Sequence, residues 1–181
     1  MRIIGGEFRG RRLASVGKGD TGAHLRPTSD RVRESLFNIL GNYGVIEGAH
    51  VLDLFAGTGA LGLEALSRGA ESVTFVENGR AGQKLLGENI ALCRAKDRTR
   101  VLARDARRIG AGTPHDLIFL DPPYGKALGE AALEVALTGG WLAPGALVVW
   151  EESAEVAVPS GLTLQDERRY GDTVIRIFTL D

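Results

Sequence analysis

The region that governs the architecture reads Val51-Leu52-Asp53-Leu54-Phe55-Ala56-Gly57-Thr58-Gly59-Ala60-Leu61-Gly62. Its first five residues are mostly apolar and predict a buried strand, and residues 63–68 are typical of a helix. The three glycines between them have the spacing of a nucleotide-binding loop. There they allow a tight turn, close approach of a ligand to the backbone, and close packing of the helix. The stretch therefore predicts a strand, a glycine loop and a helix in succession.

Strands and helices alternate downstream of this unit. Apolar runs predict strands at 72–76, 100–103, 116–120, 146–150, 162–170 and 173–180, and amphipathic runs predict helices at 81–94 and 130–137. The last two strands are joined at Gly171-Asp172, a turn short enough for a hairpin. With strand 51–55 they predict a Rossmann-like α/β fold, a seven-stranded, mostly parallel sheet with a C-terminal antiparallel hairpin.

A further helix precedes the first strand. Residues 27–30 read as its start. The apolar residues that recur on one face are Val32, Leu36, Ile39 and Leu40. A helix in this position must lie against the sheet to bury that face. It would bring the corner Arg26-Pro27-Thr28 close to the glycine loop, which makes Arg26 and Thr28 candidate contacts for a bound nucleotide.

Composition is that of one globular domain. Of the 181 residues, 44% are hydrophobic and 25% are charged, which is atypical of disordered or membrane-spanning chains. No apolar stretch approaches the roughly 20 residues that cross a bilayer, and no signal peptide is evident, so we expect a cytoplasmic protein. The lone cysteine, Cys93, is expected in the core beside Leu86 and Ile90. The three histidines are scattered, so no metal site is expected.

Charge is distributed unevenly along the chain. Residues 1–33 hold eight basic and three acidic residues, a net charge of +5, whereas the other 14 basic and 20 acidic residues give −6. Clustered arginines gain from counterion release when they bind phosphates, which favours a nucleic-acid-binding arm over a merely solvated charged surface. Residues 1–4 and 8–13 flank Gly5-Gly6-Glu7 and predict a hairpin. We therefore divide the chain into a basic hairpin and loop extension, residues 1–25, and a main domain, residues 26–181. The candidate phosphate contacts are Arg2, Arg9, Arg11 and Arg12.

Two acids favour an adenosine-containing ligand at the glycine loop. Glu77 ends the second strand 20 residues after Gly57, the separation expected of an acid that hydrogen-bonds a ribose. The loop itself suits either NAD or S-adenosylmethionine. Asp53 favours the latter, because a carboxylate just before the glycines faces a cationic amino-acid group better than a pyrophosphate. The alternatives are that Asp53 is a polar strand end and that Glu77 is an acid favoured at a helix N-terminus.

A second motif, Asp121-Pro122-Pro123-Tyr124, follows the strand 116–120. The exocyclic amine of a nucleobase is a poor nucleophile because its lone pair is delocalised into the ring. The Asp121 carboxylate and the Pro122 carbonyl can each accept one N–H, so that positioning and electrostatics replace strong-base chemistry. The two prolines restrict the backbone, and Tyr124 can stack on the base. The alternative is a strand terminator with a simple turn.

Four acids end, or nearly end, four different predicted strands: Asp53, Glu77, Asp105 and Asp121. In a doubly wound sheet, ligands bind outside the carboxyl ends of the strands, beside the switch in strand order. These acids are therefore expected at one rim. For Asp105 two roles stay open, a hydrogen bond to an adenine amine and a cap on a following short helix.

On these motifs the chain resembles a known family, the bacterial small-subunit ribosomal RNA guanine-N2 methyltransferases of the RsmD type. The resemblance covers essentially the whole chain. It rests on residues 1–6 with Arg9-Gly10-Arg11, on Arg26-Pro27-Thr28-Ser29-Asp30-Arg31-Val32-Arg33-Glu34-Ser35-Leu36-Phe37-Asn38, on residues 53–59, and on residues 121–124. The second of these discriminates best, because adenine and cytosine amino-methyltransferases share the Asp-Pro-Pro-Tyr type of motif.

The resemblance implies a class I methyltransferase domain over residues 26–181. It implies methyl transfer from S-adenosylmethionine, leaving S-adenosylhomocysteine, to the 2-amino group of one guanine in 16S ribosomal RNA. The implied substrate is a partly assembled small subunit, gripped by the basic extension. Nothing in the sequence requires more than a monomer.

The same resemblance assigns residues to roles. The implied cofactor contacts are Asp53, Phe55, Ala56, Gly57, Thr58, Gly59, Glu77, Asn78, Asp105 and Ala106. Asp121 and Pro122 would hold the guanine while Tyr124 stacks on it. Three alternatives remain: an adenine-N6 methyltransferase acting on DNA or RNA, a non-catalytic RNA-binding module, and an NAD enzyme.

Overall fold

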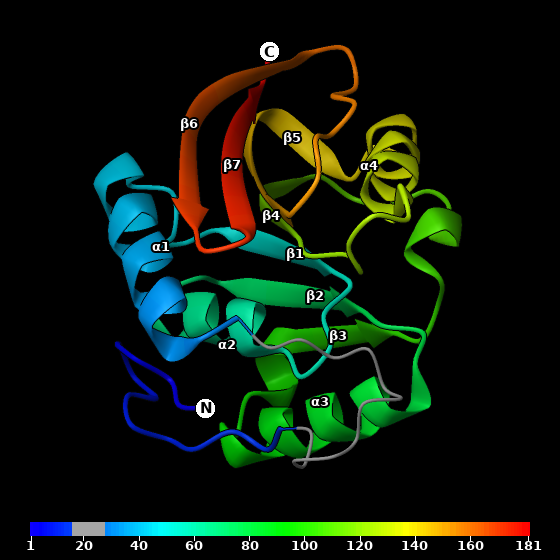
Figure 1. Cartoon of the computed structure of the whole chain (residues 1–181). Coiled ribbons are helices and arrows are strands. Elements are labelled where there is room, and N and C mark those ends of the chain that lie inside the picture. The colour runs from blue at the N-terminus through cyan, green and yellow to red at the C-terminus, as the bar shows by residue number, and fades with distance from the viewer. Residues whose placement is uncertain (16–27) are drawn as a thin grey trace.

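The computed structural model describes residues 1–15 and 28–181. Seven strands form one sheet in the order β3-β2-β1-β4-β5-β7-β6 (Figure 1). Five of them pair in parallel: β1 (His50–Leu54), β2 (Ser72–Val76), β3 (Thr99–Leu102), β4 (His115–Leu120) and β5 (Leu142–Glu152). β7 (Thr173–Leu180) runs antiparallel to β5 and to β6 (Leu162–Tyr170). The predicted sheet with its C-terminal hairpin is confirmed, and the order of the parallel strands switches beside β1.

Helices cover both faces of the sheet. One face packs against α1 (Asp30–Tyr43), α2 (Ala60–Ser67) and α3 (Arg80–Leu92), and the other against α4 (Leu128–Thr138) and the short 3-10 helix η3 (Ala106–Arg108). A second 3-10 helix, η2 (Lys96–Arg98), precedes β3. Adjacent residues of β4 divide between the two cores, with Phe119 on the α1 side and Ile118 on the α4 side. No helix in the described ranges is both long and apolar enough to span a membrane.

Several boundaries differ from the predicted ones for local reasons. β1 ends at Leu54 because Phe55 turns the chain with a φ of 58°. α3 ends at Leu92, two residues early, and Arg94 has a φ of 50°. β5 is longer than the predicted 146–150 at both ends, since it continues through Pro144 and Gly145, residues that usually interrupt strands. This length brings two further acids to the end of β5.

The buried face of α1 includes the predicted Leu36 and Leu40 but is shifted from the predicted one. Ser29 caps the helix by accepting a hydrogen bond from Val32 N, and the face that points to the core consists of Arg33, Leu36, Phe37 and Leu40. Val32 and Ile39 are only half-buried. Arg33 is fully buried because its guanidinium meets Asp30 Oδ1 at 2.7 Å and Glu64 Oε1 at 3.7 Å. The predicted contact Arg26 lies outside the described residues.

The N-terminal segment doubles back, but it pairs through a single antiparallel bridge, between Arg2 and Arg12, rather than as two strands. Its apolar residues Ile3, Phe8 and Leu13 are buried in the core that contains α1, α2 and α3. The segment is therefore docked on the main domain.

Cys93 is buried next to the end of α3 and belongs to the same core as Leu86 and Ile90, as predicted.

Candidate functional site

The glycine loop begins where β1 ends. Phe55, Gly57 and Gly59 have positive φ angles of 58°, 56° and 82°. Such a backbone is unfavourable for phenylalanine, and strain of this kind is common at ligand-binding sites. Hydrogen bonds from Ala56 N to Val76 O and from Gly59 N to Ala56 O, each 2.9 Å, close the turn. The loop therefore lies at the rim of the sheet, between β1 and α2 (Figure 1).

The helix after the loop packs closely on the sheet. A Cβ atom at Gly62 would lie 2.5 Å from Phe75 Cε1 and 2.8 Å from Val73 Cγ1. A Cβ atom at Gly59 would lie 2.5 Å from Leu86 Cδ1. The close helix packing predicted from the third glycine is confirmed.

Glu77 organises the glycine loop. Its Oε1 accepts a hydrogen bond from Gly57 N at 2.7 Å, and its Oε2 accepts one from Gly79 N at 2.8 Å. The carboxylate therefore bridges the loop after β1 and the start of α3. Because each oxygen has a second acceptor position, both contacts leave room for donors from a ligand. The next residue, Asn78, is exposed.

Asp53 lies beneath the loop and is almost fully buried. Its Oδ2 accepts a hydrogen bond from Gly62 N at 3.0 Å. Burial raises the pKa of Asp53 well above that of an ordinary aspartate, the bond from Gly62 opposes the rise, and the charge of Glu77 adds to it. A charge held here is costly without a cation, which suits a cationic ligand.

Asp105 caps η3, as one of its two predicted roles required. Its side chain accepts hydrogen bonds from Arg107 N at 2.9 Å and from the Arg107 guanidinium, and the contacts with the Arg107 side chain are the main reason that the pKa of Asp105 is lowered. Ala106 is buried in the core beside α4.

Asp121 follows β4 on the face that carries Asp53. Asp53 is in register with Phe119, so Asp121 lies two residues further along the neighbouring strand. Asp121 is half-buried and Pro122 is buried. Burial is the main cause that raises the pKa of Asp121 well above the usual range. Nearby negative charges add to the rise, in the order Glu151, Asp53 and Glu152.

Tyr124 is fixed by its hydroxyl. The hydroxyl donates to Glu151 Oε1 at 3.1 Å and lies 2.7 Å from Thr173 Oγ1. These contacts join the Asp-Pro-Pro-Tyr turn to β5 and β7. Burial is the main cause that raises the pKa of Tyr124, so the hydroxyl stays protonated at neutral pH.

Sequence reasoning missed two buried acids at the end of β5. Glu151 accepts from Tyr124 and, at 2.8 Å, from the Thr28 hydroxyl. Glu152 Oε1 accepts from Gly125 N at 3.2 Å and from Ser153 N at 3.0 Å, which holds the turn after Tyr124. The signal that identified the other strand-end acids would have found both, had β5 been extended past Trp150. The hydroxyl of Thr28, predicted as a cofactor contact, donates its hydrogen bond to Glu151.

Asn89 of α3 was also missed. It is fully buried, and its Nδ2 donates to Thr58 O at 2.9 Å and to Ala14 O at 3.0 Å, while its Oδ1 accepts from Ala14 N at 2.7 Å. This side chain joins the glycine loop to the N-terminal segment. Thr58 itself is buried.

The predicted RNA contacts Arg2, Arg9, Arg11 and Arg12 are all exposed. Arg11 Nη1 donates to Leu92 O at 3.2 Å, at the end of α3. α3 begins near the carboxyl end of β2 and runs back along the sheet. Its last residue therefore lies away from the rim that holds Asp121. The structure therefore brings Asp53, the glycine loop, Glu77 and Asp121 to one rim, and places Arg11 at some distance from them.

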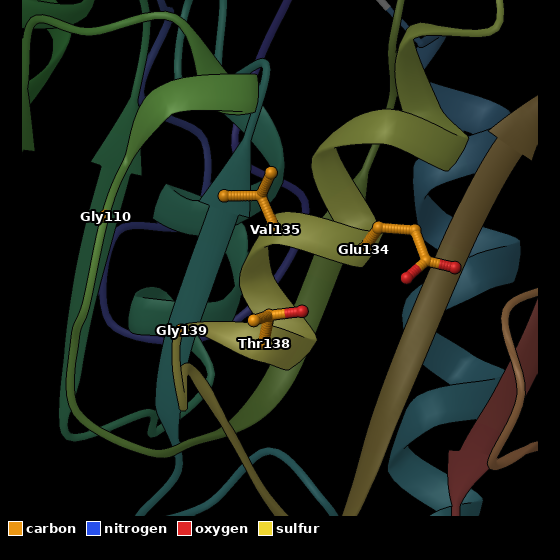
Figure 2. A pocket seen from close by; sticks show the side chains of 5 residues that line it. All are labelled: Gly110, Glu134, Val135, Thr138 and Gly139. Atoms are coloured by element: carbon orange, nitrogen blue, oxygen red, sulfur yellow. The ribbon is translucent and has the colours of Figure 1, made fainter.

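The shallow depression drawn in Figure 2 lies elsewhere. It has a volume of about 320 Å³ and is lined by Gly110, Glu134, Val135, Thr138 and Gly139. Gly110 precedes β4 and Gly139 precedes β5, so the depression lies toward the amino ends of these strands, away from Asp121. Within the described residues, no three His, Cys, Asp or Glu side chains are arranged to hold a metal ion.

Comparison with known proteins agrees with this geometry. A family model described as conserved hypothetical protein 95 matches residues 1–179. Ribosomal RNA small subunit methyltransferase D of Escherichia coli is 42% identical over 98% of this chain and 89% of that protein. The protein of the same name from Haemophilus influenzae is 36% identical over 98% of this chain and 93% of its own.

A solved structure also resembles this chain over its whole length. A methyltransferase from Escherichia coli superposes with a TM-score of 0.87 and 42% identity, covering 100% of this chain and 98% of that one. The chain therefore belongs to the family described as conserved hypothetical protein 95 and is a relative of ribosomal RNA small subunit methyltransferase D, as its motifs predicted.

Proposed function

We propose that the protein transfers a methyl group from S-adenosylmethionine to the 2-amino group of one guanine in small-subunit ribosomal RNA. The observation that carries this proposal is the position of the Asp121-Pro122-Pro123-Tyr124 turn, at the carboxyl end of β4 and directly beside the glycine loop that follows β1. An acceptor-rich turn and a nucleotide loop on adjacent strands suit a base on one side and an adenosyl donor on the other. The names of the relatives support the same reaction.

The described residues fit S-adenosylmethionine. The donor is cationic, and Asp53, Glu77 and Asp105 supply carboxylates at the ends of three neighbouring strands. Asp53 and the backbone of residues 55–59 would hold the methionine part and Glu77 the ribose hydroxyls. Asn78, Asp105 and Ala106 would border adenine, and Thr28 would lie close to the bound cofactor. When bound, S-adenosylmethionine supplies an electrophilic methyl group on sulfur.

The chain's own part is to reshape the amine. The Asp121 carboxylate and the Pro122 carbonyl would each accept one N–H of the guanine 2-amino group, which aims the nitrogen lone pair toward the methyl donor. The prolines hold these acceptors rigid, and Tyr124, fixed through Glu151 and Thr173, offers its ring for stacking. Asp121 or water accepts the departing proton.

The substrate base must be accessible. A guanine that is paired or stacked cannot reach this rim, so the enzyme would take an unpaired base or turn one out, at a few kcal/mol. We assign the RNA grip to the basic extension, residues 1–25, and the chemistry to residues 26–181. We further propose a monomer that acts in the cytoplasm on a partly assembled small subunit.

The test is methyl transfer in vitro. The purified protein is incubated with labelled S-adenosylmethionine and either small-subunit particles from a strain that lacks the enzyme or duplex DNA. The methylated nucleoside is identified by mass spectrometry, and binding of NAD is measured by calorimetry. The proposal expects N2-methylguanosine at one position. N6-methyladenine, or label only in duplex DNA, would favour the adenine alternative, and binding of NAD without transfer would overturn the proposal.

A further inference from the structure

Glu151 lies beside Asp121 on the sheet. Leu120 of β4 is in register with Trp150 of β5, and Asp121 and Glu151 are the next residues on these parallel strands. Side chains alternate along a strand, and the preceding residues on the same face, Phe119 and Val149, share the core with α1. Both carboxylates therefore point to the side of the sheet where α1 begins. Glu151 is only 8% exposed.

Two neutral donors orient the Glu151 carboxylate. Tyr124 donates to Oε1 at 3.1 Å and Thr28 donates to Oε2 at 2.8 Å. Each oxygen keeps a second acceptor position. Within residues 1–15 and 28–181, Glu151 forms no salt bridge. The side chain is thus held in place with acceptor capacity left over, next to the acid that we assign to the target amine.

A nearly buried carboxylate with unused acceptor positions is stabilised by a further hydrogen-bond donor. Burial raises the pKa of Glu151, so its ionised form is disfavoured until donors surround it. The pairing edge of guanine presents two adjacent donors, N1–H and the 2-amino group. Adenine presents an acceptor at N1, whose lone pair would face the carboxylate.

We propose that Glu151 accepts the N1–H of the target guanine and so selects guanine over purines that lack this donor. The inference rests on the proposed function, because it adds a second contact to the base whose amine Asp121 holds. Asp121 then positions the reacting nitrogen, and Glu151 determines which base is admitted. A site built to bind a donor rejects an analogue without one, because its own acceptor would be left unpaired.

The test separates recognition of N1–H from support of the fold. Small-subunit particles are assembled from 16S RNA that carries either guanine or 2,6-diaminopurine at the methylated position. Diaminopurine keeps the 2-amino group but has an acceptor at N1. The wild-type protein is expected to methylate guanine about 10- to 100-fold faster, the discrimination of about 1–3 kcal/mol typical of specific base contacts. In Glu151→Gln, whose amide can donate to N1, this ratio is expected to fall toward one.

Glu152→Gln is the matched control. It alters the next acid, which points to the opposite side of the strand and holds Gly125 and Ser153. We expect it to change the rates on both bases alike and to keep the wild-type ratio. Binding of S-adenosylhomocysteine by both variants, measured by calorimetry, reports that they are folded.

The outcomes distinguish the two proposals. A Glu151→Gln variant that binds S-adenosylhomocysteine and keeps the wild-type ratio would overturn the role of Glu151 while leaving the proposed function intact. A wild-type protein that methylates neither kind of particle would overturn the proposed function, and the inference with it.

Discussion

The Glu77 carboxylate accepts a hydrogen bond from the amide of Gly57 at 2.7 Å, and this contact ties the end of β2 to the loop after β1. Its other oxygen accepts from Gly79 N, so one side chain holds both segments that would flank the proposed adenosyl group. An acid in this position usually contacts a ribose. In this chain the same carboxylate also holds the glycine loop in place.

Replacing Glu77 with glutamine should weaken cofactor binding. The Glu77→Gln amide keeps only one acceptor oxygen, so either Gly57 N or Gly79 N loses a hydrogen bond to a charged group, which contributes about 1.5–3 kcal/mol. We expect the Kd for S-adenosylhomocysteine, measured by calorimetry, to rise about tenfold or more. Glu71→Gln, at an exposed position before β2, serves as the control and should leave the Kd unchanged. An unchanged Kd in Glu77→Gln would show that the loop holds the cofactor without this contact.

Asp53 should cost stability at neutral pH. Its folded pKa is raised above the unfolded one, so the folded state binds the proton more tightly. The stability that the protonated Asp53 side chain contributes is therefore fully present below the unfolded pKa. It is lost as pH rises through the folded pKa. Asp53→Asn keeps an acceptor for Gly62 N and removes this loss. We expect the variant to have a higher Tm than wild type at neutral pH, with the difference vanishing near pH ~4, and a weaker affinity for S-adenosylhomocysteine.

A lower Tm of Asp53→Asn at every pH would contradict this account of the buried carboxylate. The measurement is thermal unfolding of both proteins across the pH range in which an aspartate with a raised pKa titrates.

Glu64 should be a major anchor of the N-terminal segment. Fully buried, it accepts from Ile4 N at 2.9 Å and Gly5 N at 3.0 Å, pairs with Arg68 at 2.9 Å, and lies 3.7 Å from the buried Arg33. Glu64→Ala leaves the Arg33 charge without this partner, and we expect the free energy of unfolding in urea to fall by about 3–5 kcal/mol.

The control for Glu64 is Glu7→Ala, which breaks the exposed pair with Arg98. It should cost less than about 1 kcal/mol. Equal losses in the two variants would mean that the buried network contributes no more than a surface pair.

The basic extension should contribute to RNA affinity through phosphates. We expect the double variant Arg9→Ala/Arg12→Ala to bind small-subunit RNA more weakly and with a shallower dependence on salt, by about one unit of slope for each lost phosphate contact. Arg11 is left in place because it also packs over Phe8 and bonds to Leu92. Arg168→Ala/Arg169→Ala on β6 removes the same charge elsewhere, and an identical change in slope there would argue against a specific role of the extension.

Much of the candidate site could be predicted from the sequence, because an acid at the end of an apolar run marks the end of a buried strand. Asp53 lies near the end of an apolar run, Glu77 and Asp121 each follow one, and parallel strands bring such ends to one rim. The bounds of β6 and β7 match the predicted ranges, since alternation and the Gly171-Asp172 turn fix a hairpin locally.

The features that sequence reasoning missed depend on partners distant in the chain. Arg33 is buried with Asp30 and Glu64 as ionic partners, and helical periodicity cannot show the pairing with the distant Glu64. Glu151 was missed because β5 continues beyond its apolar centre into two acids, which pairing with β7 keeps in the sheet. The docking of the N-terminal segment rests on contacts such as that of Phe8 N with Ser67 Oγ, across 59 positions of sequence.

The most direct test of the central claim is Asp121→Asn. The substitution keeps the shape of the side chain but replaces one acceptor oxygen with an amide. We predict that the single-turnover rate of guanine methylation falls about 10²- to 10³-fold, the effect of removing one preorganised electrostatic contact, while the Kd for S-adenosylhomocysteine stays within about twofold of wild type. An Asp121→Asn protein that methylates at the wild-type rate, or that loses cofactor binding in proportion to its rate, would contradict the assignment of Asp121 to the target amine.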